Sequence, residues 1–204
     1  MITLLSYNIE WGKRLDEAAN WIMALSPKPD IICLQEMPQE KIPSLKKRLD
    51  QHGYSYKYAP SYTKGDTTYG ELTAYDKGKL ALDFVKIVDL GSSIVARLIS
   101  RHNSKYTSLL TVFKYGRKNF IVINIHLSPH ALNMRRRKQL GIAIEALQLL
   151  KYVNMPSLIV GDYNYSSLIF RGGLIRFMAK HGFATGHKKK LITHRKWRIQ
   201  HQTD

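Results

Sequence analysis

Acidic residues are scarce in this chain of 204 residues, which has 15 Asp and Glu against 32 Lys and Arg and a formal net charge of +17. A surplus of this size creates a positive potential that attracts polyanions before any specific contact forms, so phosphate-bearing partners are expected. From Asn133 onward the chain has 14 basic and 3 acidic residues, and this last third is expected to face the polyanion. A basic surface that serves only solubility is the alternative.

Cysteine is almost absent, and long apolar runs are absent altogether. The single cysteine, Cys33, excludes an intramolecular disulfide, and its place in an apolar run predicts that it packs in the core. No segment approaches the ~18 apolar residues of a membrane span, and the N-terminus lacks the charged and apolar regions of a signal peptide. We therefore expect a soluble, monomeric, cytoplasmic protein.

Short apolar runs and helical periodicity alternate along the chain. The runs that predict strands lie at 2–7, 29–34, 84–88, 94–99, 108–115, 120–126 and 157–160. Apolar residues at helical spacing predict helices around 15–23, 45–49 and 140–150. The stretch 54–126 predicts consecutive strands joined by turns, with helices before and after it. This order favours an α/β fold of the four-layer α/β/β/α sandwich type, in one domain over residues 1–204.

Polar residues with metal-binding or acid/base chemistry follow several of the predicted strands. They are Asn8, Glu36, His126, Asp162 and Asn164. Strands of one sheet can bring such residues to a shared edge. A carboxylate with neighbouring amide oxygens suits Mg²⁺, whereas the lack of a cysteine or histidine cluster disfavours zinc. Taken singly, each such residue would more often cap a helix or form a turn.

Four short segments carry a family resemblance by their order and spacing. They are Ser-Tyr-Asn-Ile-Glu-Trp at 6–11, Leu-Gln-Glu at 34–36, Asn-Ile-His-Leu at 124–127 and Gly-Asp-Tyr-Asn at 161–164. Together they resemble the endonuclease/exonuclease/phosphatase superfamily, which has the DNase I-like fold. Arg136 with Gln139, and the segment 197–204, look like two further family segments.

The resemblance implies a metal site and a cofactor. Glu36 is expected to bind Mg²⁺ directly, with Asn8 in the same site and Asp204 at an acidic position beside it. Mn²⁺ is the alternative ion.

The resemblance also implies catalytic roles. Asp162 is expected to orient or deprotonate the attacking water, Asn164 and Arg136 to bind the substrate phosphate, and His126 to act in catalysis with Asn8. In physical terms, such donors would meet the charge that develops in an in-line displacement at phosphorus. An isolated His126 would more often be a hydrogen-bonded core histidine.

The chain departs from the family pattern at its end. Members normally continue beyond the position of Asp204 through one or two strands to a Ser-Asp-His motif, which is not found here. We therefore expect a chain that is incomplete at its C-terminus and lacks the last strands. Loss of such an acid/base group would lower the rate by ~10²–10⁴ or more.

Three functions are compatible with these residues. The first is a Mg²⁺-dependent nuclease or DNA/RNA-end phosphodiesterase, and the form Asn-x-His-Leu disfavours an abasic-site specialist. The second is the same chemistry on phosphoinositides, sphingomyelin-like lipids or small phosphoesters, because a metal site does not by itself choose a substrate. The third is a catalytically inactive module that binds nucleic acid through its basic last third.

Overall fold

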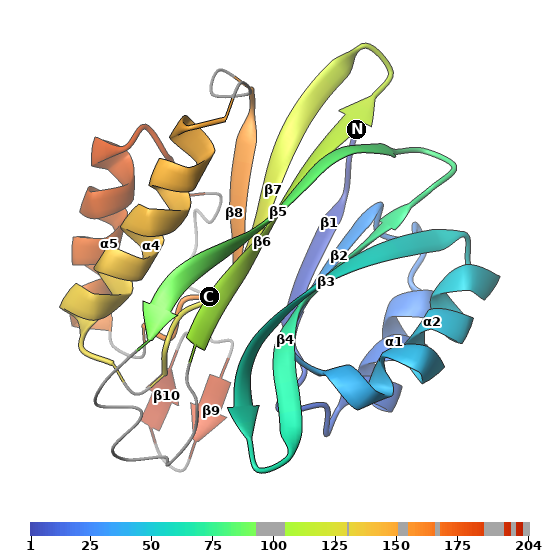
Figure 1. Cartoon of the computed structure of the whole chain (residues 1–204), viewed down its shortest axis with the longest axis horizontal. Coiled ribbons are helices and arrows are strands. Elements are labelled where there is room, and N and C mark those ends of the chain that lie inside the picture. Colours follow the sequence, from blue (N-terminus) through green and yellow to red (C-terminus); the bar gives the residue numbers. More distant parts are fainter. Residues whose placement is uncertain are drawn as a thin grey trace.

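Two β-sheets lie face to face at the centre of the molecule, and helices cover the outer face of each (Figure 1). The computed structural model describes residues 1–92, 105–129, 131–150, 155–165, 168–185, 194–196 and 199–201. The layers run helices, sheet, sheet, helices, which confirms the predicted four-layer α/β/β/α sandwich.

The first sheet is formed by the N-terminal half of the chain. Its strands, in spatial order, are β1 (Leu4–Asn8), β2 (Ile31–Pro38), β4 (Thr67–Asp76) and β3 (Tyr54–Lys64). β1 and β2 are parallel, whereas β4 is antiparallel to both of its neighbours. Two helices, α1 (Leu15–Ala24) and α2 (Ile42–Gln51), cover its outer face, with the 3₁₀ turn η1 (Gln39–Lys41) before α2.

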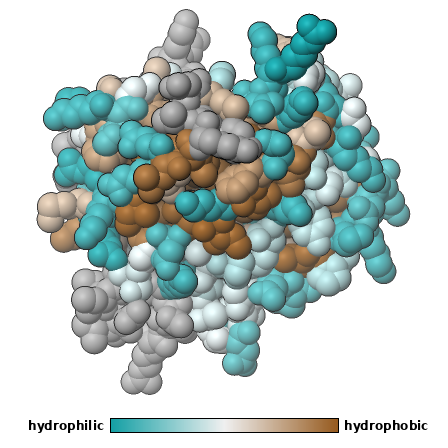
Figure 2. Space-filling view, turned by 45° about the horizontal axis from the view of Figure 1, so that its top comes forward, coloured by the Kyte–Doolittle hydropathy of each residue, from teal (hydrophilic) through white to brown (hydrophobic). Residues whose placement is uncertain are grey.

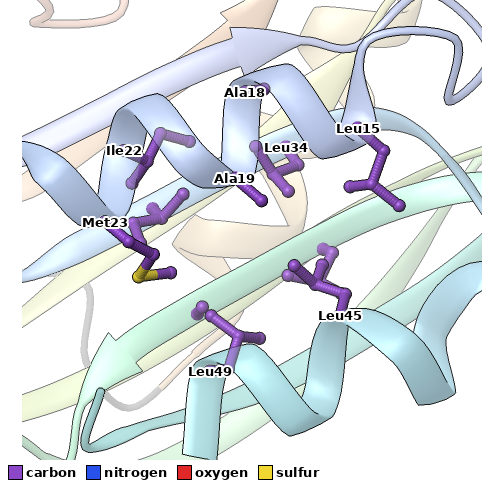
Figure 3. A pocket seen from close by; sticks show the side chains of 11 residues that line it. Leu15, Ala18, Ala19, Ile22, Met23, Leu34, Leu45 and Leu49 are labelled. Atoms are coloured by element: carbon purple, nitrogen blue, oxygen red, sulfur yellow. The ribbon is translucent and has the colours of Figure 1, made fainter. Parts of the chain in front are cut away.

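The helices of this first layer pack on the sheet through apolar stripes. Leu15, Ala18, Ala19 and Ile22 are buried along α1, as the helical spacing predicts. Between α1, α2 and the sheet the packing leaves a void of about 10 Å³ that is lined by apolar side chains (Figure 3). A void of this size with no polar lining does not hold a stable water, so it is part of the core and no ligand site.

The second sheet comes from the middle and later part of the chain. Its strands, in spatial order, are β5 (Ala81–Ser92), β6 (Lys105–Tyr115), β7 (Lys118–His126) and β8 (Ser157–Asp162). Helices α4 (Asn133–Gln148) and α5 (Leu168–Lys180) lie outside it. Two short strands, β9 (His194–Lys196) and β10 (Ile199–His201), pair with each other.

The core between the sheets is aromatic and aliphatic, with Cys33, Tyr75, Phe113 and Val122 among its buried members. The packing role expected for Cys33 is confirmed, and burial raises the pKa of its thiol to about 12. Apolar side chains also reach the surface, and Figure 2 shows them gathered near the middle of one face among hydrophilic residues. Within the described ranges, no helix has the length and apolar character needed to cross a membrane.

One described helix was not expected from the sequence. Helix α5 is not among the predicted helices, because Gly172 and Gly173 interrupt its sequence and lower its helix propensity. The strand expected at 94–99 lies outside the described residues. The remaining predicted strands are present, and most of them extend further than the apolar runs that indicated them.

Candidate active site

The carboxyl ends of two parallel strand pairs meet at one end of the sandwich. Asn8 at the end of β1 pairs in register with Gln35 of β2, and His126 at the end of β7 pairs with Asp162 of β8. The side-chain amide of Asn8 donates to Oδ2 of Asp162 at 2.9 Å and so joins the two sheets. The convergence expected from strand order is therefore present.

Glu36 turns toward this junction because β2 is irregular where it occurs. The pairing of β2 with β4 shifts register between Leu34 and Met37, and Glu36 has a φ of 59°. A β-bulge of this kind redirects a side chain that would otherwise follow the alternation of the strand. Oε2 of Glu36 accepts the backbone N–H of Trp11 at 2.7 Å, and Oε1 lies 3.7 Å from Nε2 of His126.

His126 is buried but has no conventional partner. Its side chain is 1% exposed, and neither ring nitrogen makes a hydrogen bond to the residues that the structure describes. Tyr62 closes one side of the ring at 6.1 Å between centroids, edge to face. Leaving a buried polar group without a hydrogen bond costs about 1–3 kcal/mol. A buried histidine of this kind is therefore typical of a site that binds a ligand.

Asp162 is held in one orientation by its neighbours. The backbone N–H of Asn164 donates to Oδ1 at 2.8 Å, while Asn8 occupies Oδ2. Asn164 has a φ of 53°, and its side-chain amide donates to the carbonyl of Leu127 at 2.7 Å. Asp162 is 8% exposed, and its residue pairs in register with His126 on the neighbouring strand.

Backbone strain is concentrated in the same place. The non-glycine residues with positive φ in the described chain are Glu10, Trp11, Glu36 and Asn164. All of them belong to the loops and strand ends that form this site. Each such conformation costs of the order of 1 kcal/mol or more and persists where the surrounding contacts impose it, which is common at functional sites.

Arg136 supports the site from the start of α4. It is the buried residue among the four consecutive basic ones at 135–138. Its guanidinium donates to the carbonyls of Ser128 and Pro129 and to Oδ1 of Asn133, at 2.9, 2.7 and 2.8 Å. These contacts hold the segment after β7, and the phosphate contact expected for Arg136 stays a prediction.

A buried amide pair was not foreseen from the sequence. Nε2 of Gln35 donates to Oδ1 of Asn124 at 2.8 Å, and the amide of Asn124 donates to the carbonyls of Leu34 and Leu72. Both side chains are almost fully buried between the sheets. Gln35 directly precedes Glu36 and Asn124 lies two residues before His126, so the bond between them links the two strands that carry these site residues. Gln35 and Asn124 belong to the motifs Leu-Gln-Glu and Asn-Ile-His-Leu, and this was the signal in the sequence that could have identified them.

Burial shifts the pKa of two acidic side chains near Glu36. Burial raises the pKa of the Glu71 carboxyl well above its usual range, and the hydrogen bond from Thr107 opposes that rise only in part. Burial, with the Glu36 carboxylate nearby, also raises the pKa of Tyr62. Both shifts favour the neutral form of the side chain near Glu36.

The donor set fits a hard cation that keeps part of its water shell. Among the described residues, no three His, Cys, Asp or Glu side chains gather in a metal-binding group. Mg²⁺ needs only one or two protein carboxylates, and Glu36 with the neighbouring amide of Asn8 can supply such a site. Asp204, the third predicted metal residue, lies outside the described residues.

Comparison with known proteins gives a family and a fold. The family model described as Endonuclease/Exonuclease/phosphatase family matches residues 5–188. Drosophila melanogaster Protein angel is 30% identical over an alignment of 167 positions that covers 76% of this chain and 44% of that protein. The chain thus spans less than half the length of this curated relative.

Solved structures agree on the fold. The human Nocturnin catalytic domain with bound sulfate superposes with a TM-score of 0.66 at 18% identity, covering 81% of this chain and 65% of that one. D. rerio TDP2 complexed with a single-strand DNA product gives 0.64 at 17% identity, covering 91% and 66%. At these identities the likeness concerns the fold, and the predicted DNase I-like architecture is confirmed.

Proposed function

This chain belongs to the endonuclease/exonuclease/phosphatase family of phosphoester hydrolases, and from that premise we propose that it is a divalent-metal-dependent phosphodiesterase that acts on nucleic acids or their ends. The observation that carries the proposal is the junction of Glu36, His126 and Asp162. Three distant segments bring together a carboxylate, a buried histidine that makes no hydrogen bond to the described residues, and an oriented carboxylate. A nucleic-acid substrate is supported by the charge of +17 and by the single-strand DNA product in the TDP2 structure.

Each residue of the site has its own role in the proposed reaction. Glu36, with Asn8, would hold Mg²⁺ or Mn²⁺, which when bound neutralises charge on the phosphate oxygens. Asp162, fixed by Asn8 and Asn164, accepts the proton of a water whose oxygen attacks phosphorus in line with the departing ester oxygen. The bond from phosphorus to that ester oxygen breaks, and the departing oxygen takes up a proton from bulk water. His126 donates to the phosphoryl oxygen where charge develops, and the free amide hydrogen of Asn164 binds the phosphate.

The test is hydrolysis of labelled single- and double-stranded DNA and RNA oligonucleotides by the full chain, with and without Mg²⁺. We expect cleavage that EDTA stops and that Mg²⁺ or Mn²⁺ restores. Asp162→Asn and Glu36→Gln should each lower kcat/KM by about 10²–10⁴-fold, because each removes a group that acts in the transition state. Asp50→Asn is the matched control, since Asp50 is exposed and, among the described residues, its carboxylate pairs with Lys46 alone.

Other outcomes would replace the proposal. Release of phosphate or headgroup from phosphoinositides or sphingomyelin, with all nucleic acids left intact, would assign the same site to lipid or small phosphoester substrates. Salt-sensitive nucleic-acid binding that Asp162→Asn leaves unchanged, with no turnover by the wild type on any substrate, would make the chain an inactive binding module. Wild-type rates in Asp162→Asn would refute the assigned mechanism.

A further inference from the structure

The aromatic side chain of Trp11 is exposed near the candidate site. Trp11 is 40% exposed, although most large apolar residues near the sheets are buried. Its backbone N–H holds Oε2 of Glu36 at 2.7 Å, so the indole belongs to the residue that contacts the metal-binding carboxylate. The side chain of Trp11 hydrogen-bonds Tyr62, and the ring of Tyr62 lies 6.1 Å from that of His126 between centroids. The indole therefore lies near the candidate site.

Several contacts define the conformation of the loop that carries Trp11. Oδ1 of Asn8 accepts the N–H of Glu10 at 2.9 Å, and the ammonium of Lys41 donates to the carbonyl of Gly12 at 3.0 Å. Gly12 has a φ of 73°, and a Cβ there would lie 2.3 Å from the ring of Pro38. The exposure of the indole is therefore imposed by the fold, since these contacts define the course of the chain on both sides of it.

Two lysines face the indole. The ammonium of Lys64, at the end of β3, lies 3.4 Å from the ring centroid, and that of Lys13 lies 5.3 Å from it. Both side chains are exposed. The nearest acid in sequence, Glu10, pairs with Arg14 at 3.3 Å, so the charge that the indole faces is positive.

From this arrangement we infer that Trp11, Lys64 and Lys13 form a subsite for a single-stranded nucleotide, with the base stacked on the indole and the lysines on the flanking phosphates. The inference deepens the proposed function by naming the substrate class. A cation–π contact at an exposed site is weaker than the stacking of a nucleobase on an aromatic ring. A base can therefore replace Lys64 on the ring, and the ammonium released binds phosphate.

Single strands fit this subsite better than a duplex or a membrane. A base can stack on a side chain only when it is free of its neighbours in a duplex. Stable attachment to a membrane needs a broad apolar face with basic residues around it, whereas the contacts here involve one indole and two lysines. The observations therefore favour a nucleotide over a lipid surface.

The test measures binding without turnover, by fluorescence anisotropy of a labelled oligothymidylate in EDTA. Trp11→Ala should weaken binding by about 5- to 150-fold, the range of one stacked base. Trp11→Phe should retain most of the affinity. For a sugar-phosphate oligomer of the same length without bases, Trp11→Ala and the wild type should bind equally.

Matched variants separate stacking from charge and from folding. Trp21→Ala should bind like the wild type, because Trp21 is 52% exposed on α1 and contacts Tyr7. Lys64→Gln should weaken binding of both polymers and reduce the salt slope of log K by about 0.7, the value for one phosphate contact on a single strand.

Each remaining outcome decides against the subsite or against the proposed function. Equal losses of Trp11→Ala on both polymers, no loss on oligothymidylate, or a loss only on phosphatidylserine vesicles would overturn the subsite. Base-dependent binding by a wild type that cleaves no phosphodiester with Mg²⁺ would support the subsite and refute the proposed hydrolysis.

Discussion

At the scale of single residues, Asp30 connects three segments of the first sheet. Its Oδ2 accepts the backbone N–H and the hydroxyl of Thr3 at 2.6 and 3.0 Å, and its Oδ1 accepts the ammonium of Lys79 at 2.7 Å. Burial would raise the pKa of this carboxyl, but Lys79 and the two bonds from Thr3 outweigh burial and hold it below its ordinary value. Folding therefore favours the ionised form of the Asp30 carboxyl.

Asp30→Asn should lower the free energy of unfolding by about 1–3 kcal/mol near pH 7, because hydrogen bonds to a charged group are lost. A depressed pKa stabilises the fold above the unfolded value of about 3.9, and this contribution is lost as the pH falls through the lower folded value. The difference between variant and wild type should therefore shrink below about pH 4. Urea unfolding of both proteins between pH 7 and pH 3 measures this difference in the free energy of unfolding. A difference that does not change with pH would contradict the stabilising role of the ionised Asp30.

At the scale of secondary-structure elements, the approach of β8 to β7 depends on Gly161. A Cβ at this position would lie 1.9 Å from the carbonyl oxygen of Ile125, and its φ is 134°. The strands can pair in the observed register, His126 opposite Asp162, only because no side chain intervenes. The relative position of His126 and Asp162 therefore depends on how closely β7 and β8 approach each other.

Gly161→Ala should destabilise the protein by at least about 2 kcal/mol, through overpacking against backbone and an unfavourable φ. It should also lower hydrolysis more than stability alone explains, because Asp162 moves with β8. Gly173→Ala in α5 is the control, since its Cβ would meet nothing within 4 Å. That change should stabilise by about 0.5–1 kcal/mol. Thermal unfolding compares the two, and similar shifts in both would exclude the steric explanation.

At the scale of the whole molecule, the net charge of +17 acts on any polyanion that approaches. Part of it is neutralised locally, for example where Lys105 pairs with Asp89 and Arg48 with Asp16. Such exposed pairs contribute little to stability. The main consequence of the charge is therefore long-range attraction and counterion release on binding.

Binding of single-stranded oligonucleotides should fall by about 10²-fold between roughly 50 and 200 mM salt, the value for about five phosphate contacts. Anisotropy titrations at several salt concentrations in EDTA measure this slope. An affinity that does not change with salt would show that the basic residues serve solubility.

The separate segments of the site were evident before the structure, whereas their mutual geometry was not. Asn8, Glu36, His126, Asp162 and Asn164 were each recognisable because short motifs surround them and strands precede them. Their distances depend on registers and bulges that involve residues far away in sequence. The buried amide pair of Gln35 and Asn124 shows this, because its bond spans the two sheets.

The amino-acid sequence by itself determined the layers, the charge, and the chemical identity of the groups in the site, because apolar periodicity and residue type are local properties. Tertiary structure decided where these groups point. Only the bulge in β2 turns Glu36 toward His126, and only the packed loop at Glu10–Gly12 presents the indole of Trp11 beside it. Helix α5 likewise forms against the second sheet despite its glycines, since tertiary packing can override weak local propensity.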